Sequence, residues 1–190
     1  MRISVLIIIL CFSLSAIKCS SKKESSNLQQ VLGLQKMSDM VTSEYVVTKI
    51  IKANDDKTWY KLGDRKILMT CKASLVAGID LSKLTEKDIQ IDGENISITL
   101  PHAKLLYLNI KPEDIRTAYQ DISAFRDNFS SQEKNELAAQ AEKQIRSSAD
   151  SLGIFVTAET NATLFINNFL QKEGFKNIRI NFSSVKSPLQ

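Results

Sequence analysis

The chain has 190 residues, of which 43% are hydrophobic and 24% are charged, with only 6 glycines and 3 prolines. This composition is typical of a globular protein and excludes collagen-like, low-complexity and disulfide-rich classes. The formal net charge is only +4, and no run of Lys and Arg is interleaved with aromatic residues, so we expect no nucleic-acid partner.

The N-terminus has the pattern of an export signal over residues 1–18. Arg2 precedes an apolar stretch at residues 5–17, which is shorter than the roughly 20 residues that a membrane-spanning helix needs. Cys19 follows, where a bacterial lipoprotein signal carries the cysteine that becomes lipidated. Lys18 is unusual just before such a cysteine, so an uncleaved anchor and a secreted soluble product are alternatives. We expect lipidation at Cys19, membrane contact through the N-terminus, and a place in the bacterial cell envelope, on the periplasmic or outer face.

The rest of the chain is expected to form one domain between two polar ends. Residues 19–27 are a hydrophilic tether without periodicity, and residues 184–190 are a frayed tail. Residues 28–183 carry the periodic patterns of a single domain, which begins with a short helix within residues 28–40.

Alternation of apolar and polar residues predicts the strands. Residues 41–52 are rich in Val, Ile and Thr and form the first strand. A polar connection follows, and it contains Trp59 and Tyr60. The clearest strand is residues 65–79, because every odd-numbered position from 67 onward is apolar. That side of the strand is therefore expected to face a core.

A hairpin is predicted next, with residues 89–91 and 96–100 on either side of Asp92-Gly93. Pro101 ends its second strand because proline cannot donate a backbone hydrogen bond. Residues 105–110 read as one more strand.

Two amphipathic helices and a final strand complete the prediction. Ser130 to Glu133 form a capping box, which starts the first helix. The second helix ends at Gly174, and residues 178–182 then alternate as a strand. We therefore predict an α+β fold: an antiparallel or mixed sheet, followed by two amphipathic helices packed on one face and a final strand.

The matching periods of strand and helices also predict the core. The strand residues expected in it are Ile67, Met69, Cys71, Ala73 and Leu75. The helix residues expected to cover them are Leu137, Ala141, Ile145, Phe165 and Phe169.

Three sequence blocks resemble a known family. They are Ala77-Gly78-Ile79-Asp80-Leu81-Ser82, Thr99-Leu100-Pro101-His102-Ala103-Lys104-Leu105-Leu106 and the stretch from Gly153-Ile154-Phe155 to Gly174-Phe175. Together they resemble the bacterial domain of unknown function 4230 family, over residues 28–182. The resemblance implies that the chain shares the fold of this family and carries an N-terminal membrane anchor or lipoprotein signal. It implies no catalytic residues.

Several common chemistries are excluded by residue spacing. The glycines stand at least 15 residues apart, so no phosphate-binding or dinucleotide-binding loop is present. His102 is the only histidine, and Cys71 is the only cysteine outside the N-terminal segment. We therefore expect no metal site and no cofactor.

Four residues are candidates for function, each beside a structural alternative. Asp80 follows a buried strand and suits a ligand or general base, although an Asx cap of the next turn is the commoner role. Trp59 and Tyr60 suit ligand or membrane contact, although large rings usually fold over a sheet edge. His102 lies in no nucleophile motif, so a strand-end histidine is the simpler interpretation.

The remaining candidate chemistries are weak. Cys71 has no basic cluster nearby in the sequence and is expected to be an inert buried thiol. Glu113 and Asp114 are adjacent, so their side chains diverge and do not form a glycosidase pair.

These observations favour a membrane-tethered, non-enzymatic binding or assembly module with an unknown protein or small-molecule partner. The alternative is a hydrolase that uses carboxylates near Asp80. A third hypothesis, insertion of the two helices into a membrane, is weakened by Asn161, Asn167 and Asn168, which are costly in lipid.

Overall fold

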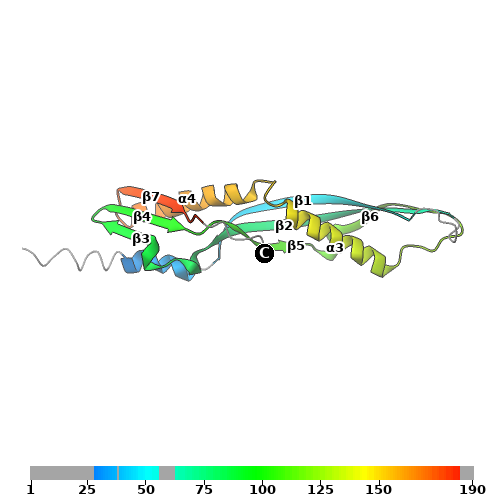
Figure 1. Ribbon diagram of the computed structural model, residues 1–190, viewed down its shortest axis with the longest axis horizontal. Coiled ribbons are helices and arrows are strands. Elements are labelled where there is room, and N and C mark those ends of the chain that lie inside the picture. The colour runs from blue at the N-terminus through cyan, green and yellow to red at the C-terminus, as the bar shows by residue number, and fades with distance from the viewer. Residues whose placement is uncertain (1–27, 38, 56–62, 185–190) are drawn as a thin grey trace, which may run out of the picture. The chain divides into compact units, whose positions relative to one another are not determined.

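The computed structural model of the protein describes residues 28–37, 39–55 and 63–184. They form an α+β fold, as predicted (Figure 1). The strands and helices are, in chain order, β1 (Asp39–Asp55), β2 (Arg65–Asp80), β3 (Ile89–Asp92), β4 (Asn95–Leu100), β5 (Lys104–Asn109), β6 (Ile115–Ile122), α3 (Ser131–Ser148), α4 (Ile154–Lys172) and β7 (Asn177–Phe182).

The described residues divide into two compact units. The first, called the three-stranded unit, combines residues 28–37, 80–101 and 163–184, and the second, called the four-stranded unit, combines residues 39–55, 63–79 and 102–162. Helix α4 begins in the four-stranded unit and ends in the three-stranded unit. A single domain over residues 28–183 stays a prediction.

The four-stranded unit is built around β2, which has β1 on one side and both β5 and β6 on the other. Both of the latter strands run antiparallel to β2, with Ser74 opposite Asn109 and Cys71 opposite Ile115. Between these two pairs the chain leaves the sheet in a 3₁₀ turn, Pro112–Asp114. Pro112 suits this excursion because it has no N–H to give to a ladder.

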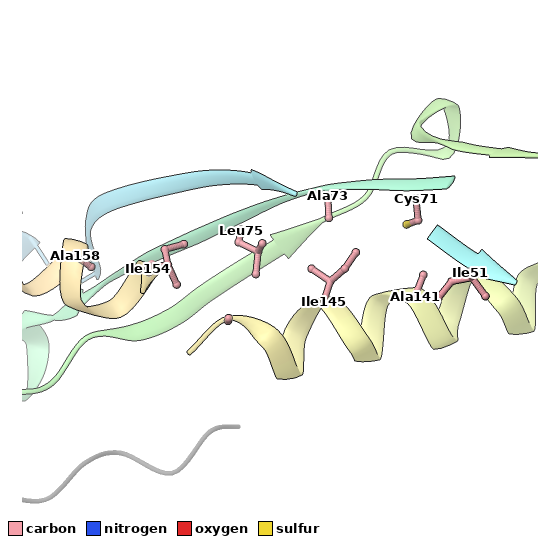
Figure 2. Close-up of a cluster of buried hydrophobic side chains, with 10 residues drawn as sticks. Ile51, Cys71, Ala73, Leu75, Ala141, Ile145, Ile154 and Ala158 are labelled. Carbon is pink, nitrogen blue, oxygen red and sulfur yellow. The ribbon is translucent and has the colours of Figure 1, made fainter. Parts of the chain in front are cut away.

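The core of this unit lies on the odd-numbered side of β2, as predicted. Figure 2 shows the side chains of α3 and the start of α4 directed at that side of the strand. The buried members of this cluster are Ile51, Cys71, Ala73, Leu75, Ala77, Ala141, Ile145, Ala149, Ile154 and Ala158.

The prediction that Phe165 and Phe169 cover this core was wrong. Phe165 is 43% exposed, and the buried residues of α4 in this core are Ile154 and Ala158. The buried stripe of α4 continues at Ala162 and Ile166. Phe165 precedes Ile166 by one residue, which turns it away by about 100°.

The three-stranded unit contains the predicted hairpin and a parallel pairing. Strands β3 and β4 pair antiparallel through Ile89 and Ile98, and the turn between them places Gly93 at a φ of 59°. That positive φ favours glycine because it has no Cβ. The final strand, β7, pairs with the other side of β4 in parallel, with Ile96 beside Ile178.

Helix α3 starts at the predicted capping box. The Ser130 side chain accepts from the Glu133 amide at 3.2 Å, and the Glu133 carboxylate accepts from the Ser130 amide at 2.8 Å. Across the described part of the chain, no helix has the length and apolar character needed to cross a membrane.

Candidate functional site

The three-stranded sheet has one apolar side and one polar side. Because neighbouring strands keep a fixed register, residues of the same side form rows across β3, β4 and β7. One polar row is Gln90, Ser97 and Arg179, and the next is Asp92, Asn95 and Asn177. We call these six residues the polar face.

A shallow hollow of about 560 Å³ lies over the polar face. Its lining includes all six residues and also Lys176. All but Ser97 among the six are exposed, so the side chains are available to a ligand. The hollow thus combines three side-chain amides, one hydroxyl, one guanidinium, one ammonium and one carboxylate, and its lining also includes Ile91, Ile96 and Ile178.

Hydrogen bonds order the centre of the polar face. The Asn177 side-chain amide donates to the Asn95 side-chain oxygen at 2.7 Å, and the Asn95 amide donates to the Asp92 carbonyl at 3.0 Å. Beside them, Lys176 forms an ion pair with Glu94 at 2.8 Å. The amides are therefore held in place without being sealed from solvent.

The two outer charges of the polar face have no ion-pair partner within the described ranges. Neither Arg179 on β7 nor Asp92 on β3 has a charged partner among the residues that the structure describes. Two strand spacings of about 4.8 Å separate these strands. A ligand on this face therefore meets a cation at one edge, neutral hydrogen-bonding groups in the middle and a carboxylate at the other edge.

Asp80 lies at the end of β2, in the three-stranded unit. Its carboxylate accepts a hydrogen bond from the Ser82 hydroxyl and lies 3.8 Å from the Lys83 ammonium. The predicted Asx cap is not formed, because the Asp80 side chain makes no capping hydrogen bond at the start of the following turn. The carboxylate thus bonds side chains of that turn.

His102 lies in the four-stranded unit, where it pairs with a glutamate. Its Nδ1 lies 2.7 Å from Oε1 of Glu159, and the same oxygen accepts from the Ala103 amide at 3.2 Å. Both side chains are about one-fifth to one-quarter exposed, at 20% and 24%. Glu159 therefore attaches the segment after Pro101 to helix α4. No local pattern predicts this pair, because 57 residues separate its members.

The other candidates have different outcomes. Trp59, Tyr60 and Cys19 lie outside the described residues. Cys71 is buried at 2% exposure. Burial raises the pKa of its thiol, and the negative charges of Glu142 and Asp114 raise it further.

Metal chemistry finds no support in the described ranges. No three His, Cys, Asp or Glu side chains come together there in a way that would hold an ion.

Sequence reasoning predicted the strands of the polar face but missed the face itself. The polar residues of β3 and β4 alternate regularly, which is the signal that was available. Their alignment with Asn177 and Arg179 depends on a pairing between segments about 80 residues apart, which alternation does not specify.

Comparison with known proteins gives one match. A family model described as "Protein of unknown function (DUF4230)" matches residues 33–180. No curated protein and no solved structure matches the chain. The matched range includes the whole of β1 to α4 and most of β7.

Proposed function

The chain belongs to the DUF4230 family, and we propose that it is a non-enzymatic binding module held at the bacterial cell envelope by its N-terminus. The family description states no activity, so the proposal depends on the residues of this chain. It has two parts, a tether and a binding surface.

The tether is supported by the order of residues at the N-terminus. An apolar stretch of 13 residues precedes Cys19, and the polar segment after it has no apolar face with which to insert. Two or more acyl chains on one residue give stable anchoring, because each buried CH₂ contributes about 0.8 kcal/mol. Lys22 and Lys23 add attraction to anionic headgroups.

The binding surface is the polar face, and its hollow is the observation that carries the proposal. Ligand sites are concave and contain a few fixed polar groups. Here Asn95 and Asn177 are ordered by their own hydrogen bonds, and each side-chain amide provides both donor and acceptor groups. Such groups suit the hydroxyls of a polar ligand.

Arg179 specifies the charge of that ligand. A guanidinium presents a planar set of donors that matches a carboxylate or phosphate. Because Lys176 is already paired with Glu94, Arg179 is the cation of the hollow that an anion meets without displacing a carboxylate. The ligand class is therefore a hydroxyl-rich molecule with an anionic group, such as an acidic oligosaccharide.

Calorimetry with the full chain in detergent micelles tests this function. The probes are a uronic-acid oligosaccharide and a neutral oligosaccharide of the same length. We expect tighter binding of the acidic probe. We expect Arg179→Gln to remove that preference, because it takes away the positive charge and leaves a neutral hydrogen-bonding side chain.

Arg116→Gln is the matched control, because Arg116 is an exposed arginine on β6 outside the hollow. This variant is expected to bind both probes as the wild type does. Equal effects of the two substitutions, or no binding of either probe, would show that the polar face is not the binding surface for this ligand class.

A further inference from the structure

Strand β1 lies at an edge of the four-stranded sheet. It has 17 residues, whereas strands in globular proteins usually have about 3–10. An edge strand presents a row of unpaired backbone N–H and C=O groups, which natural proteins normally cover or interrupt.

Among the described residues, contacts from outside the sheet cover only the first part of this edge. The Thr42 hydroxyl donates to the Ala158 carbonyl at 3.0 Å, and the Asn161 amide donates to the Thr42 carbonyl at 2.7 Å. The Tyr45 hydroxyl lies 3.0 Å from that of Thr157. Within the described residues, no hydrogen bond outside the sheet involves residues 46–54, so this part of the edge is open.

The open part carries exposed apolar side chains. Val46 is 63% exposed and Ile50 is 53% exposed, with Thr48 between them on the same side of the strand. The core helices pack on the other side, where Tyr45, Val47 and Ile51 contact them. Exposed β-branched residues on an open edge are a site for strand addition.

The charges around these residues are self-complementary. Glu44 and Lys52 flank the apolar pair at equal distances in sequence from Thr48. Glu44 accepts a hydrogen bond from Ser74, and neither Glu44 nor Lys52 has an ion-pair partner among the described residues. If two copies of the strand run antiparallel about Thr48, each Val46 faces Ile50 and each Glu44 faces Lys52.

We propose that residues 44–52 of β1 pair antiparallel with the same residues of a second copy of this chain. A two-fold axis beside Thr48 then joins two four-stranded sheets into one. Apolar and opposite-charge pairs directly across an antiparallel ladder stabilise it. With a second copy, the Val46–Ile50 pair and the Glu44–Lys52 pair each form twice. The residues of the hollow are not part of β1, so this pairing does not use them.

Cysteine crosslinking in bacterial membranes tests the pairing with the full chain. In a Cys11→Ser background that keeps Cys19 and with it the tether, Thr48→Cys places a thiol opposite the same thiol of the second copy. We expect rapid oxidation to a disulfide-linked product of twice the chain mass. Thr117→Cys, an exposed position on β6, is the control and is expected to remain monomeric.

The register is tested by mixing two differently tagged chains. Val46→Cys in one chain is expected to crosslink with Ile50→Cys in the other. Val46→Cys is not expected to crosslink with itself, because antiparallel pairing about Thr48 separates these positions by four residues, or about 13 Å.

Charge exchange provides a second test. Lys52→Glu puts two glutamates opposite each other and should reduce the Thr48→Cys product to the level of the control. Adding Glu44→Lys restores opposite charges and should restore the product. All these residues are exposed, so circular dichroism should show an unchanged fold.

Three results would overturn the proposal. They are crosslinking of Thr48→Cys no faster than that of Thr117→Cys, a Val46→Cys chain that links to itself in preference to Ile50→Cys, and a product whose mass shows a different protein. The last result would assign the edge to a heterologous partner.

Discussion

Arg65 donates hydrogen bonds to both carboxylate oxygens of Glu133, and this contact joins the first residue of β2 to the first turn of α3. The same guanidinium donates to Asp55 at 3.0 Å and lies 4.5 Å from the centre of the Phe129 ring. Glu133 also completes the capping box with Ser130. One carboxylate therefore stabilises both the start of a helix and its attachment to the sheet.

Glu133→Gln should destabilise the protein in a pH-dependent way. The Arg65 guanidinium holds the pKa of Glu133 below its ordinary value of 4.5, and the Ser130 amide lowers it further. A lowered pKa in the folded state means that the ionised group contributes stability above pH 4.5 and loses that contribution as the pH falls through the folded-state pKa. Urea unfolding should show the wild type more stable than Glu133→Gln at pH 7, with the difference shrinking below pH 4.5.

The control for this experiment is Glu136→Gln. Glu136 lies on the same helix and accepts a hydrogen bond only from the Gln132 side chain, with no further partner among the described residues. Its replacement should leave only a small difference in the free energy of unfolding at pH 7. A difference for Glu133→Gln that does not shrink below pH 4.5 would contradict the role given to Arg65.

Ile145→Ala should destabilise the four-stranded unit by about 2–5 kcal/mol, because Ile145 is completely buried between α3 and β2. Val156→Ala is the comparison, since Val156 is 69% exposed on α4. Its effect on the free energy of unfolding should stay within about 0.5 kcal/mol. Denaturant midpoints measure both, and equal shifts would mean that the core side of the helices is wrongly assigned.

Gly78→Ala should lower the free energy of unfolding by about 1–3 kcal/mol. A Cβ at this position would lie 2.1 Å from the Met40 carbonyl oxygen, and a backbone atom cannot move aside as a flexible side chain does. Gly33→Ala is the control, because its Cβ would have no neighbour within 4 Å. Thermal unfolding should give a clearly lower midpoint for Gly78→Ala than for Gly33→Ala. Equal midpoints would show that β1 and β2 do not approach so closely at Gly78.

The thiol of Cys71 should be inert in the native protein. Burial raises its pKa, so little of the reactive thiolate forms at neutral pH. In a Cys11→Ser, Cys19→Ser chain, a maleimide reagent should label the native protein slowly and the urea-unfolded protein rapidly. Similar rates in both states would mean that the thiol is exposed.

Cys19 should carry the membrane tether. Metabolic labelling with a fatty-acid analogue in a bacterial host should mark the wild type and not Cys19→Ala, which should also leave the membrane fraction. Cys71→Ala should keep both the label and the membrane association. An unlabelled wild type whose Cys19→Ala variant still fractionates with membranes would favour the uncleaved anchor.

Elements whose signals are local could be predicted from the amino-acid sequence. The odd-numbered apolar positions of β2, the turn at Gly93 and the capping box of Ser130 and Glu133 each lie within a few consecutive residues. Such patterns are set by the period of a strand or helix and by the groups left unpaired at its ends. The family resemblance is confirmed for the same reason, since its blocks are continuous in sequence.

Which segments pack together could not be predicted from local patterns and is seen in the folded chain. Strand β6 was missed because most of its residues are exposed and show no alternation, and its pairing with β2 is what makes it a strand. Helix α4 turns Phe165 outward because the stripe through Ala158 and Ile166 packs inward. The polar face likewise brings together Asn95 and Asn177, which are 82 positions apart, and the pair of His102 and Glu159 joins residues 57 positions apart. Periodicity tells which side of an element is apolar, but the choice of partner depends on the packing of the whole chain.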